Sequence, residues 1–534
     1  MEKTREKNKL RIGEILRNDD NLCVVIMAIA VMLTLEYFLL HLAAFEFSHA
    51  YNADTSLYWA VGRGMLHGLT PYKDMYENKP IGIFFISAVS FFLTDSPILC
   101  NVVSIISVVI TAVTPALSVM MYYRKNGGSD KPYELHVITP FFITLLSGIC
   151  LAVYCEDRSG GFQVESIGTM FSLLFIISVC ALKNSKSKKQ VVLFTVLSAL
   201  FISCAVMMKE PFLVIACAGA LLFTDKIRDI IKCIVIPCVV GGISTVVVLA
   251  ASGVLVPYLT IYIRQMFGTR LSGEVSAFTR ARDIGAMTWD LVWFDKGFYA
   301  VVMAFLVLSV FAAAGRKNSE SLFHTLKIAI MIFLASFCVG MGGQYYNHHF
   351  IFAAPIIGSL MMCGGIQLYK FMKEKKFSSG KALACFGIIA LIAFTNSLRM
   401  YGGDYTENFE RVSSYAAYVD RLLDYYDVDR YQYIGFNGEE VFIGLTKHLP
   451  QGPAFAQDRD NFTTEDTWFS QKLLEQIDGS DIVIVKILEL PALNDRLSEI
   501  LNAEFCVLPP NPYEEEPPEG FDFDIYYRID TFCE

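Results

Sequence analysis

The sequence contains few charged residues, only 18% of its 534 positions, whereas soluble globular domains usually contain about 25%. It also has no Cys-x-x-Cys spacing among its 14 cysteines, which argues against a zinc-binding motif. Most of these cysteines lie within or beside apolar runs, where a free cysteine behaves as a small hydrophobic side chain. The low charge therefore argues against an ordinary soluble enzyme, and the cysteines say nothing about a disulfide framework.

Long apolar runs occupy the first three quarters of the chain instead. A membrane-spanning helix needs about 20 residues, and ten runs are long enough, while a shorter eleventh run follows Lys209-Glu210-Pro211 at 211–224. We therefore predict an α-helical polytopic membrane protein with about eleven transmembrane helices. The ten longer runs lie near 21–43, 97–123, 136–154, 163–182, 190–208, 231–252, 297–315, 325–343, 349–369 and 382–397.

Basic residues predict the direction in which the chain crosses the membrane, because short loops rich in Lys and Arg stay cytoplasmic. All the basic loops fall on one side only if the apolar segment at 80–94 does not cross. That segment has only about 15 residues, a length typical of re-entrant or interfacial segments. We expect a multi-pass protein of the plasma (inner) membrane with a cytoplasmic N-terminus. In the alternative, 80–94 crosses and the basic loop at Arg124 lies outside.

These predictions divide the chain into a cytoplasmic segment at 1–20, a membrane domain at 21–397 and an extracytoplasmic domain at 398–534. Residues 401–534 contain 28 acidic and 9 basic side chains. This acidity argues against nucleic acid as a partner of the outer domain. Helix patterns at 407–426, 439–448 and 491–503 alternate with strand patterns at 431–436, 481–485, 505–508 and 525–528, and this alternation predicts a small α/β layer.

The first outer loop carries the most informative motif. Asp54 and Tyr58 are four residues apart and share one face of a helix. Downstream, a turn reads Gly68-Leu69-Thr70-Pro71-Tyr72-Lys73-Asp74, and Lys79-Pro80 precedes the short apolar segment. An Asp after the first membrane helix, a Gly-x-x-Pro-Tyr-x-Asp turn and a Lys-Pro resemble the GT-C glycosyltransferases. Within that superfamily, the sequence is most similar to the bacterial protein mannosyltransferases and aminoarabinose lipid A transferases.

The resemblance implies transfer of a sugar from a polyprenyl phosphate to an acceptor at the outer face, which could be a lipid, a polysaccharide or a protein. It also implies that Asp54 is the catalytic acid or base. A further acid is expected from the second outer loop, either Glu165 at the start of the next helix or Glu156 or Asp157 before it. Asp54 and Glu165 could alternatively serve only to cap helices or to face positive helix ends.

The chemistry of this transfer explains why carboxylates and cations are wanted together. A base must remove the proton of the acceptor hydroxyl as that hydroxyl attacks the anomeric carbon. The leaving group is already a phosphate, which needs positive charge. Lys79, Lys209 and Arg270 are candidate phosphate ligands, with Tyr58 beside Asp54. Lys209 could alternatively pair with the neighbouring Glu210 or reach the membrane surface.

A last motif reads Tyr345-Tyr346-Asn347-His348-His349-Phe350. It resembles a Tyr-x-His-Tyr-Phe pattern of the same family, with His349 where Tyr is usual. The sequence leaves open which histidine faces the site, and both are candidates for contact with phosphate or acceptor. Some branches of the family need a divalent metal ion and others do not, so a metal cofactor also stays open. The competing functions are a transporter or flippase of lipid-linked saccharide, and a non-catalytic assembly subunit.

Overall fold

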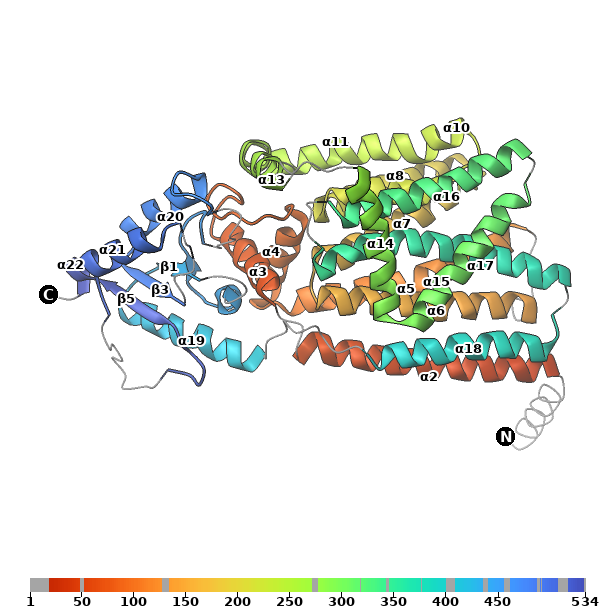
Figure 1. Cartoon of the computed structure of the whole chain (residues 1–534), viewed down its shortest axis with the longest axis horizontal. Helices are drawn as coiled ribbons and strands as arrows, with labels where there is room; N and C mark the ends of the chain where they lie inside the picture. Colours follow the sequence, from red (N-terminus) through yellow and green to blue (C-terminus); the bar gives the residue numbers. More distant parts are fainter. Residues whose placement is uncertain are drawn as a thin grey trace.

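The computed structural model has two parts arranged end to end, a long helical bundle and a smaller α/β domain (Figure 1). The C-terminus lies at the far end of the α/β domain. The structure describes residues 19–48, 52–126, 134–270, 277–316, 318–341, 345–375, 377–399, 409–435, 440–455, 462–486, 490, 492–507 and 517–532.

The predicted membrane spans are present. Within the described residues, ten helical segments are long and apolar enough to cross a membrane, and α9 (Pro211–Leu221) is shorter, with 11 residues. The protein is thus a polytopic α-helical membrane protein with a C-terminal α/β domain, as the sequence predicts. The ten segments are α2 (Asp19–Ser48), α5 (Ile98–Lys125), α6 (Leu135–Ser159), α7 (Val164–Lys183), α8 (Lys188–Met208), α10 with η1 and α11 (Ile227–Ala251), α15 (Lys296–Ala314), α16 (Asn318–Val339), η3 with α17 (Asn347–Lys375) and α18 (Ser379–Ser397).

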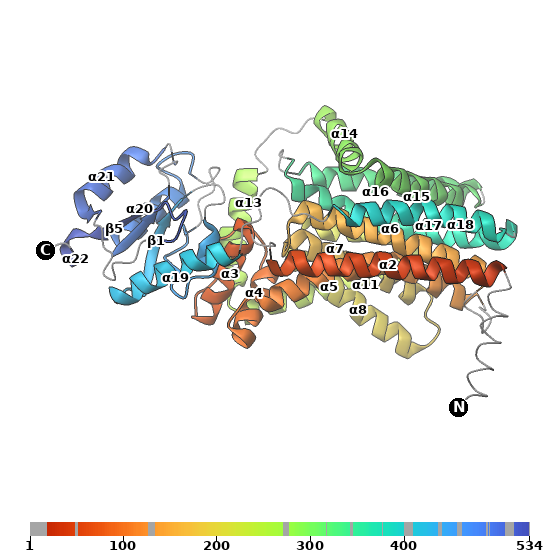
Figure 2. The same cartoon turned by 90° about the horizontal axis from the view of Figure 1, so that it is seen from below.

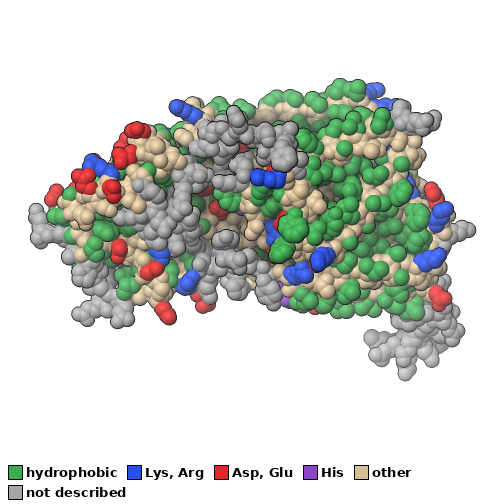
Figure 3. Space-filling view, viewed as in Figure 1, with side chains coloured by type: hydrophobic (Ala, Val, Ile, Leu, Met, Phe, Trp, Pro, Cys, Tyr) green, Lys and Arg blue, Asp and Glu red, His purple; other side chains and the backbone are tan. Residues whose placement is uncertain are grey.

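The bundle is built around two central helices. The most apolar windows of α6 and α7 are both 83% buried, whereas those of α2, α11 and α18 are 22–28% buried. The outer helices present large apolar side chains such as Met32 and Leu391, exposed by 68% and 64%. Figure 3 shows apolar side chains over much of the bundle, whereas many acidic side chains lie on the α/β part and basic side chains lie on both parts. Lipid is the environment that the apolar surface fits.

Two short helices separate the bundle from the α/β domain. They are α3 (Ala53–Leu66) and α4 (Gly82–Thr94), and both views place them at the end of the bundle (Figures 1 and 2). With 13 residues, α4 is too short to cross the hydrocarbon core. The apolar segment at 80–94 is therefore not a span of ordinary length, in agreement with the prediction from charge.

The long connection between the span that ends at Ala251 and the span that begins at Lys296 contains further helices. They are α12 (Leu255–Pro257), η2 (Tyr258–Tyr262), α13 (Ile263–Arg270) and α14 (Ala277–Phe294). Figures 1 and 2 show that α13 and α14 run across the direction of the spans. This orientation suits segments that lie along a membrane surface.

The C-terminal domain is a five-stranded sheet with helices, and the strand order is β2-β1-β3-β5-β4. Its central strands β1 and β3 are parallel, whereas β5 pairs antiparallel with both β3 and β4. The strands are β1 (Arg430–Ile434), β2 (Leu449–Pro450), β3 (Ile482–Val485), β4 (Phe505–Cys506) and β5 (Asp524–Arg528). The helical elements are α19 (Phe409–Tyr425), η4 (Glu440–Gly444), α20 (Trp468–Asp478), α21 (Asn494–Glu504) and α22 (Ile529–Phe532).

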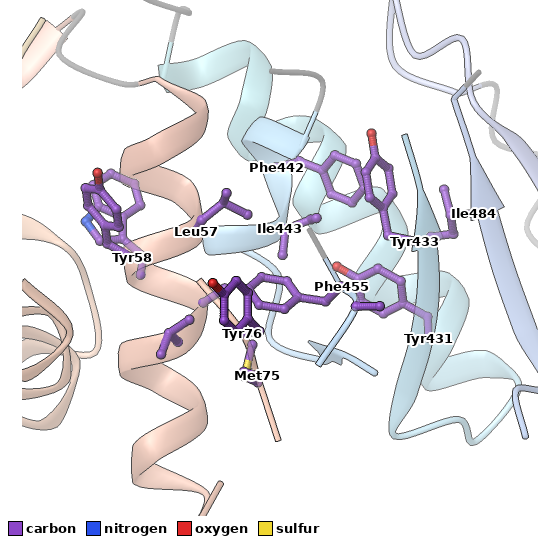
Figure 4. Close-up of a cluster of buried hydrophobic side chains, with 14 of the residues drawn as sticks. Leu57, Tyr58, Met75, Tyr76, Tyr431, Tyr433, Phe442, Ile443, Phe455 and Ile484 are labelled. Carbon is purple, nitrogen blue, oxygen red and sulfur yellow. The ribbon is translucent and has the colours of Figure 1, made fainter. Parts of the chain in front are cut away.

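This domain packs directly against α3. Figure 4 shows Leu57 of α3 pointing toward Ile443 of the domain, while Tyr58 points to the opposite side of the helix. The backbone N–H of Gly444 donates to Ser56 Oγ at 2.8 Å, and a Cβ on Gly444 would lie only 2.6 Å from the Ser56 carbonyl oxygen. The close approach fixes α3 from outside, so the domain positions whatever side chains α3 presents to the bundle.

Candidate active site

The start of α3 is tied to the loop between α6 and α7 by a network of polar side chains. Asn52 is the N-cap of α3 and accepts from the Thr55 backbone N–H at 2.9 Å. Gln163 Nε2 donates to the same Asn52 oxygen at 3.1 Å, and Asn52 Nδ2 donates to the Gly160 carbonyl at 3.3 Å. Because Asn52 is the cap, the alternative in which Asp54 serves only to cap the helix is wrong.

Asp54 lies in the first turn of α3 with its side chain 35% exposed. Tyr58 donates its hydroxyl to Asp54 Oδ2 at 3.3 Å and also to Gln163 Oε1 at 3.0 Å. Lys79 Nζ lies 3.5 Å from Asp54 Oδ2, and the lysine side chain is only 8% exposed. The predicted pair of Asp54 and Tyr58 therefore shares one face of α3, and the first-loop lysine reaches the same carboxylate.

The protonation states of this group follow from its surroundings. Burial alone would raise the pKa of Asp54, but nearby positive charges, led by Lys79, lower that pKa below its ordinary value. Burial and the charges of Asp54 and Glu165 raise the pKa of Tyr58 far above its ordinary value. At neutral pH, Asp54 is thus an ionised acceptor, and Tyr58 keeps the proton that it donates.

A strained residue shapes the loop that delivers Lys79. Tyr72 has a φ of 68°, in the left-handed region that bulky residues rarely adopt. It is fully buried and packs on Tyr262, with ring centroids 4.9 Å apart. Its hydroxyl donates to the Lys79 carbonyl oxygen at 2.9 Å. The loop is therefore pinned at the residue that faces Asp54.

Glu77 is a site residue that the sequence argument missed. Its carboxylate Oε1 lies 3.7 Å from Lys79 Nζ, and its side chain is 7% exposed. Glu77 could have been predicted from its position two residues before Lys79, in the loop that carries the motif of the candidate site. Lys79 thus lies between two carboxylates, and Asn78 Oδ1 accepts from its Nζ at 3.0 Å.

A second carboxylate–lysine pair comes from the bundle. Glu165, in the first turn of α7, is fully buried, and Lys209 Nζ lies 2.5 Å from its Oε1. Lys209 is the extended C-cap residue of α8, immediately before α9 begins at Pro211. His348 Nε2 lies 3.9 Å from the same Glu165 oxygen. The break between α8 and α9 therefore delivers a lysine to a buried acid.

The two pairs are electrostatic neighbours. The charge of Lys209 is among those that lower the pKa of Asp54, and the charge of Glu165 is among those that raise the pKa of Tyr58. Residues from four distant parts of the sequence thus face one site, namely the first loop, the start of α7 and the segments at Lys209 and His348.

The remaining second-loop acids have other contacts. Glu156 lies against Glu46 of α2, and Asp157 forms an ion pair with Arg158 at 2.8 Å. Arg158 also pairs with Asp290 of α14 at 2.9 Å. The structure therefore brings Glu165, and not Glu156 or Asp157, into contact with a cation of the candidate site.

Of the two histidines, His348 faces the site. Its side chain is 25% exposed beside Glu165, whereas His349 is 4% exposed and packs edge-on against the His348 ring at 4.6 Å. Arg270 is the last residue of α13, and its side chain lies outside the described part of the chain. Within the described ranges, no group of three or more His, Cys, Asp or Glu side chains is placed to hold a metal ion.

Comparison with known proteins identifies the fold. No protein-family model and no curated protein sequence match this chain. The crystal structure of ArnT from Cupriavidus metallidurans bound to undecaprenyl phosphate does match, with a TM-score of 0.55 over 93% of this chain and 97% of that one. ArnT in the apo state matches with a TM-score of 0.53, and both are 10% identical to this chain. The chain has a GT-C-like fold.

The predicted fold class is thereby confirmed. Because the match covers nearly the whole of both chains, the GT-C-like fold includes the C-terminal α/β domain as well as the bundle. At 10% identity, the likeness fixes the fold, and the chemistry must come from the side chains described above.

Proposed function

We propose that this protein is a membrane glycosyltransferase that moves a sugar, a hexose or a pentose, from a polyprenyl phosphate to an acceptor. The observation that carries this proposal is Asp54, an ionised and partly exposed carboxylate beside Lys79 in a GT-C-like fold. ArnT, which has the same fold, was crystallised bound to undecaprenyl phosphate. That ligand supports a polyprenyl-linked donor for this chain.

In the proposed reaction, Asp54 is the general base. The acceptor hydroxyl oxygen forms a bond to the anomeric carbon while Asp54 takes the hydroxyl proton. The bond between the anomeric carbon and the phosphate oxygen breaks, and the phosphate leaves with the electron pair. Attack from the face opposite the phosphate inverts the anomeric centre. Tyr58, which keeps its proton, donates to the carboxylate and orients it.

Lys79 and Lys209 are the proposed phosphate ligands. Each now lies beside a carboxylate, Lys79 near Asp54 and Glu77, and Lys209 near Glu165. Charge-assisted bonds to phosphate are stronger than neutral hydrogen bonds, so a bound phosphate can share these lysines with their carboxylates. His348, His349 and Arg270 stay as predicted further contacts to phosphate or acceptor.

Glu165 is proposed to assist as a positioning residue. It is fully buried and already pairs with Lys209, so it cannot reach an acceptor hydroxyl as easily as the partly exposed Asp54. Its proposed task is to hold Lys209 where the phosphate binds. Glu156 and Asp157, which have partners elsewhere, receive no part in the transfer.

The outer location of the site is also part of the proposal. Cys506 of the α/β domain is disulfide-bonded, whereas the twelve free cysteines of the described chain all lie between Cys23 and Cys385. Structural disulfides form in oxidising compartments. This distribution and the basic loops both support an extracytoplasmic C-terminal domain and a cytoplasmic N-terminus in the plasma (inner) membrane.

Reconstitution tests the proposal directly. Purified protein in liposomes that contain a polyprenyl-phosphate-linked sugar should form a new glycosidic bond on an added acceptor. Asp54→Asn should lower the rate by about 10²–10⁴-fold, the usual contribution of a general base. Asp95→Asn, at the end of α4, is the matched control and should keep full activity. Movement of the lipid-linked sugar without transfer would instead establish a transporter.

A further inference from the structure

A cluster of charged side chains lies at the end of the bundle opposite the candidate active site. Helix α7 begins at that site, with Glu165 in its first turn, and ends at Lys183 in the cluster. It has 20 residues, which corresponds to a length of about 30 Å. Figure 3 shows basic side chains at this end of the bundle, farthest from the α/β domain. The cluster is therefore too distant from Asp54 to take part in the proposed transfer.

Three cationic side chains from separate parts of the chain meet in this cluster. Lys183 and Arg316, which follows α15, both pair with Asp225, and the arginine lies 2.7 Å from the carboxylate. Lys327 of α16 is almost fully buried. Its amino group donates to the carbonyl oxygen of Thr224, the residue before Asp225. The ends of α7 and α15 and the body of α16 thus bring positive charge to one place.

The positive charge of the cluster exceeds its negative charge. Within the described part of the chain, Asp225 is the only acidic side chain that pairs with the three cations, and Lys327 has no ion-pair partner. Arg316 also donates to His324 Nε2, so this nitrogen accepts and the imidazole is neutral. The adjoining residues 226–232 contain three basic side chains and one acidic one. Uncompensated charge beside hydrocarbon is costly, so the cluster favours an anion from outside the chain.

The surface next to the cluster is apolar. Phe323 lies beside the buried cation, with its ring centroid 4.3 Å from Lys327 Nζ. Leu322 and Leu326 are exposed on α16, and Phe333 continues this exposed apolar stripe along the helix. An anion held by the cations therefore has apolar side chains beside it. This arrangement suits the acyl chains of a lipid better than it suits a soluble anion.

We propose that Lys183, Arg316 and Lys327 bind the phosphate group of an anionic phospholipid whose acyl chains lie along α16. Phosphate oxygens accept strong charge-assisted hydrogen bonds, and a guanidinium can donate two of them side by side. Basic pockets between transmembrane helices are a recurrent binding site for such headgroups. Asp225 holds the cations together, and the lipid phosphate shares them with it. This inference is independent of the proposed sugar transfer.

Thermal unfolding of the full-length protein in lipid nanodiscs tests the site without an activity assay. Nanodiscs that contain phosphatidylglycerol in phosphatidylcholine should give a Tm about 2–5 °C higher than phosphatidylcholine alone. Arg316→Gln should abolish most of this rise, and it should fold because the arginine is partly exposed. Arg124→Gln is the matched control. It removes the same charge from an exposed position in the last turn of α5, at the same end of the bundle, and should keep the rise.

A second variant should change the response in the opposite direction, which keeps the test decisive if Arg316→Gln does not fold. Asp225→Asn removes the carboxylate that competes with phosphate. Its Tm should fall in phosphatidylcholine, and phosphatidylglycerol should raise it by more than in the wild type. An ion-pair network with no lipid site predicts the same fall in both kinds of nanodisc.

Four outcomes overturn the proposal. The first is a wild type whose Tm does not respond to phosphatidylglycerol, and the second is an equal response in Arg316→Gln. The third is loss of the response in Arg124→Gln, because the lipid would then act on the general surface charge. The fourth is an equal rise on adding inorganic phosphate to phosphatidylcholine nanodiscs, because the site would then take a soluble anion.

Discussion

The two carboxylate–lysine pairs of the candidate active site contain the same chemical groups in different surroundings. Asp54 is 35% exposed, and its oxygen lies 3.5 Å from Lys79. Glu165 is fully buried, and its oxygen lies 2.5 Å from Lys209. Asp54 lies on a short helix held by the C-terminal domain, and Glu165 lies at the start of a central span. The first carboxylate is accessible and the second is not.

This difference suggests a division of labour, because the environment of a carboxylate determines what it can do. A general base must reach the proton that it removes, which Asp54 can do. A fully buried carboxylate in a tight ion pair instead fixes the position of its partner. The comparison teaches that the two acids are not interchangeable, and the predictions below test this point in order of expected effect.

The largest contrast is expected in the transfer rate. Asp54→Asn should lower kcat by about 10²–10⁴-fold with little change in KM, because the base acts in the transition state. Glu165→Gln should mainly raise KM for the lipid-linked donor, because Lys209 loses the group that holds it. Steady-state kinetics in liposomes measures both effects. Equal losses of kcat in the two variants would contradict the assignment of Asp54 as the base and of Glu165 as a positioning residue.

The next contrast is in stability. Lys209→Met leaves Glu165 buried without its ion-pair partner, which typically costs about 3–5 kcal/mol. The double variant Glu165→Gln with Lys209→Met should recover much of this loss, since no uncompensated charge remains. The double variant Lys79→Met with Glu77→Gln removes the lysine together with the charge of the buried Glu77, and it should cost far less than Lys209→Met because Asp54 is partly exposed to water. Denaturation in detergent measures the three values, and similar costs for Lys209→Met and for this double variant would contradict the comparison.

The third test concerns the pH dependence of transfer. A base acts only when ionised, and the lowered pKa of Asp54 keeps it ionised down to an unusually acidic pH. The wild type should therefore lose activity only below the ordinary range for Asp. In Lys79→Gln, burial is no longer opposed by that charge, so the pKa of Asp54 should rise and the acidic loss of activity should move to higher pH. If the profile of kcat/KM against pH is the same in Lys79→Gln and in the wild type, Lys79 is not the cause of the lowered pKa of Asp54.

The membrane spans, and the end of the bundle at which the candidate site lies, could be predicted because they depend on simple counts. Apolar run length located all ten long helices, and charge in the loops singled out 80–94, which forms the 13-residue helix α4. The same pattern placed Asp54, Lys209 and His348 at one end of the bundle. These features depend on the membrane, which imposes the same rule on each segment.

Side-chain partners could not be predicted in this way. Lys209 pairs with Glu165 and not with its neighbour Glu210, which accepts from the Tyr258 hydroxyl at 2.8 Å. Lys209 is extended just before α9 begins at Pro211, and sequence spacing does not reveal where its side chain points. Glu156 was a candidate for the same reason, since only the packing of α2 on α6 shows that it meets Glu46.

The outer domain was predicted less completely than the bundle. Its helix α19 and the strands β1, β3 and β5 were expected within a few residues of their observed bounds. Helix α20 was missed, although Thr467 caps it and Phe469, Leu473 and Ile477 follow at a spacing of four. Strand β2 has only two residues, too few for any pattern. The strand order depends on contacts across the sequence, which one sequence does not show.

The smallest effect is expected from the Tyr72 hydroxyl, which holds the loop of Lys79 in place but takes no part in the transfer itself. Tyr72→Phe removes the hydroxyl that donates to the Lys79 carbonyl oxygen but keeps the buried ring against Tyr262. Loss of one such hydrogen bond costs about 1 kcal/mol, so stability should fall slightly. Because the lysine is less firmly placed, KM for the donor should rise by about 3–10-fold with kcat nearly unchanged.

Tyr415→Phe is the matched control. It also removes a hydroxyl that donates to a backbone carbonyl, that of Glu519 in the C-terminal domain, and it should leave KM unchanged. An equal rise of KM in both variants would show that the Tyr72 hydroxyl acts through general stability and not through Lys79.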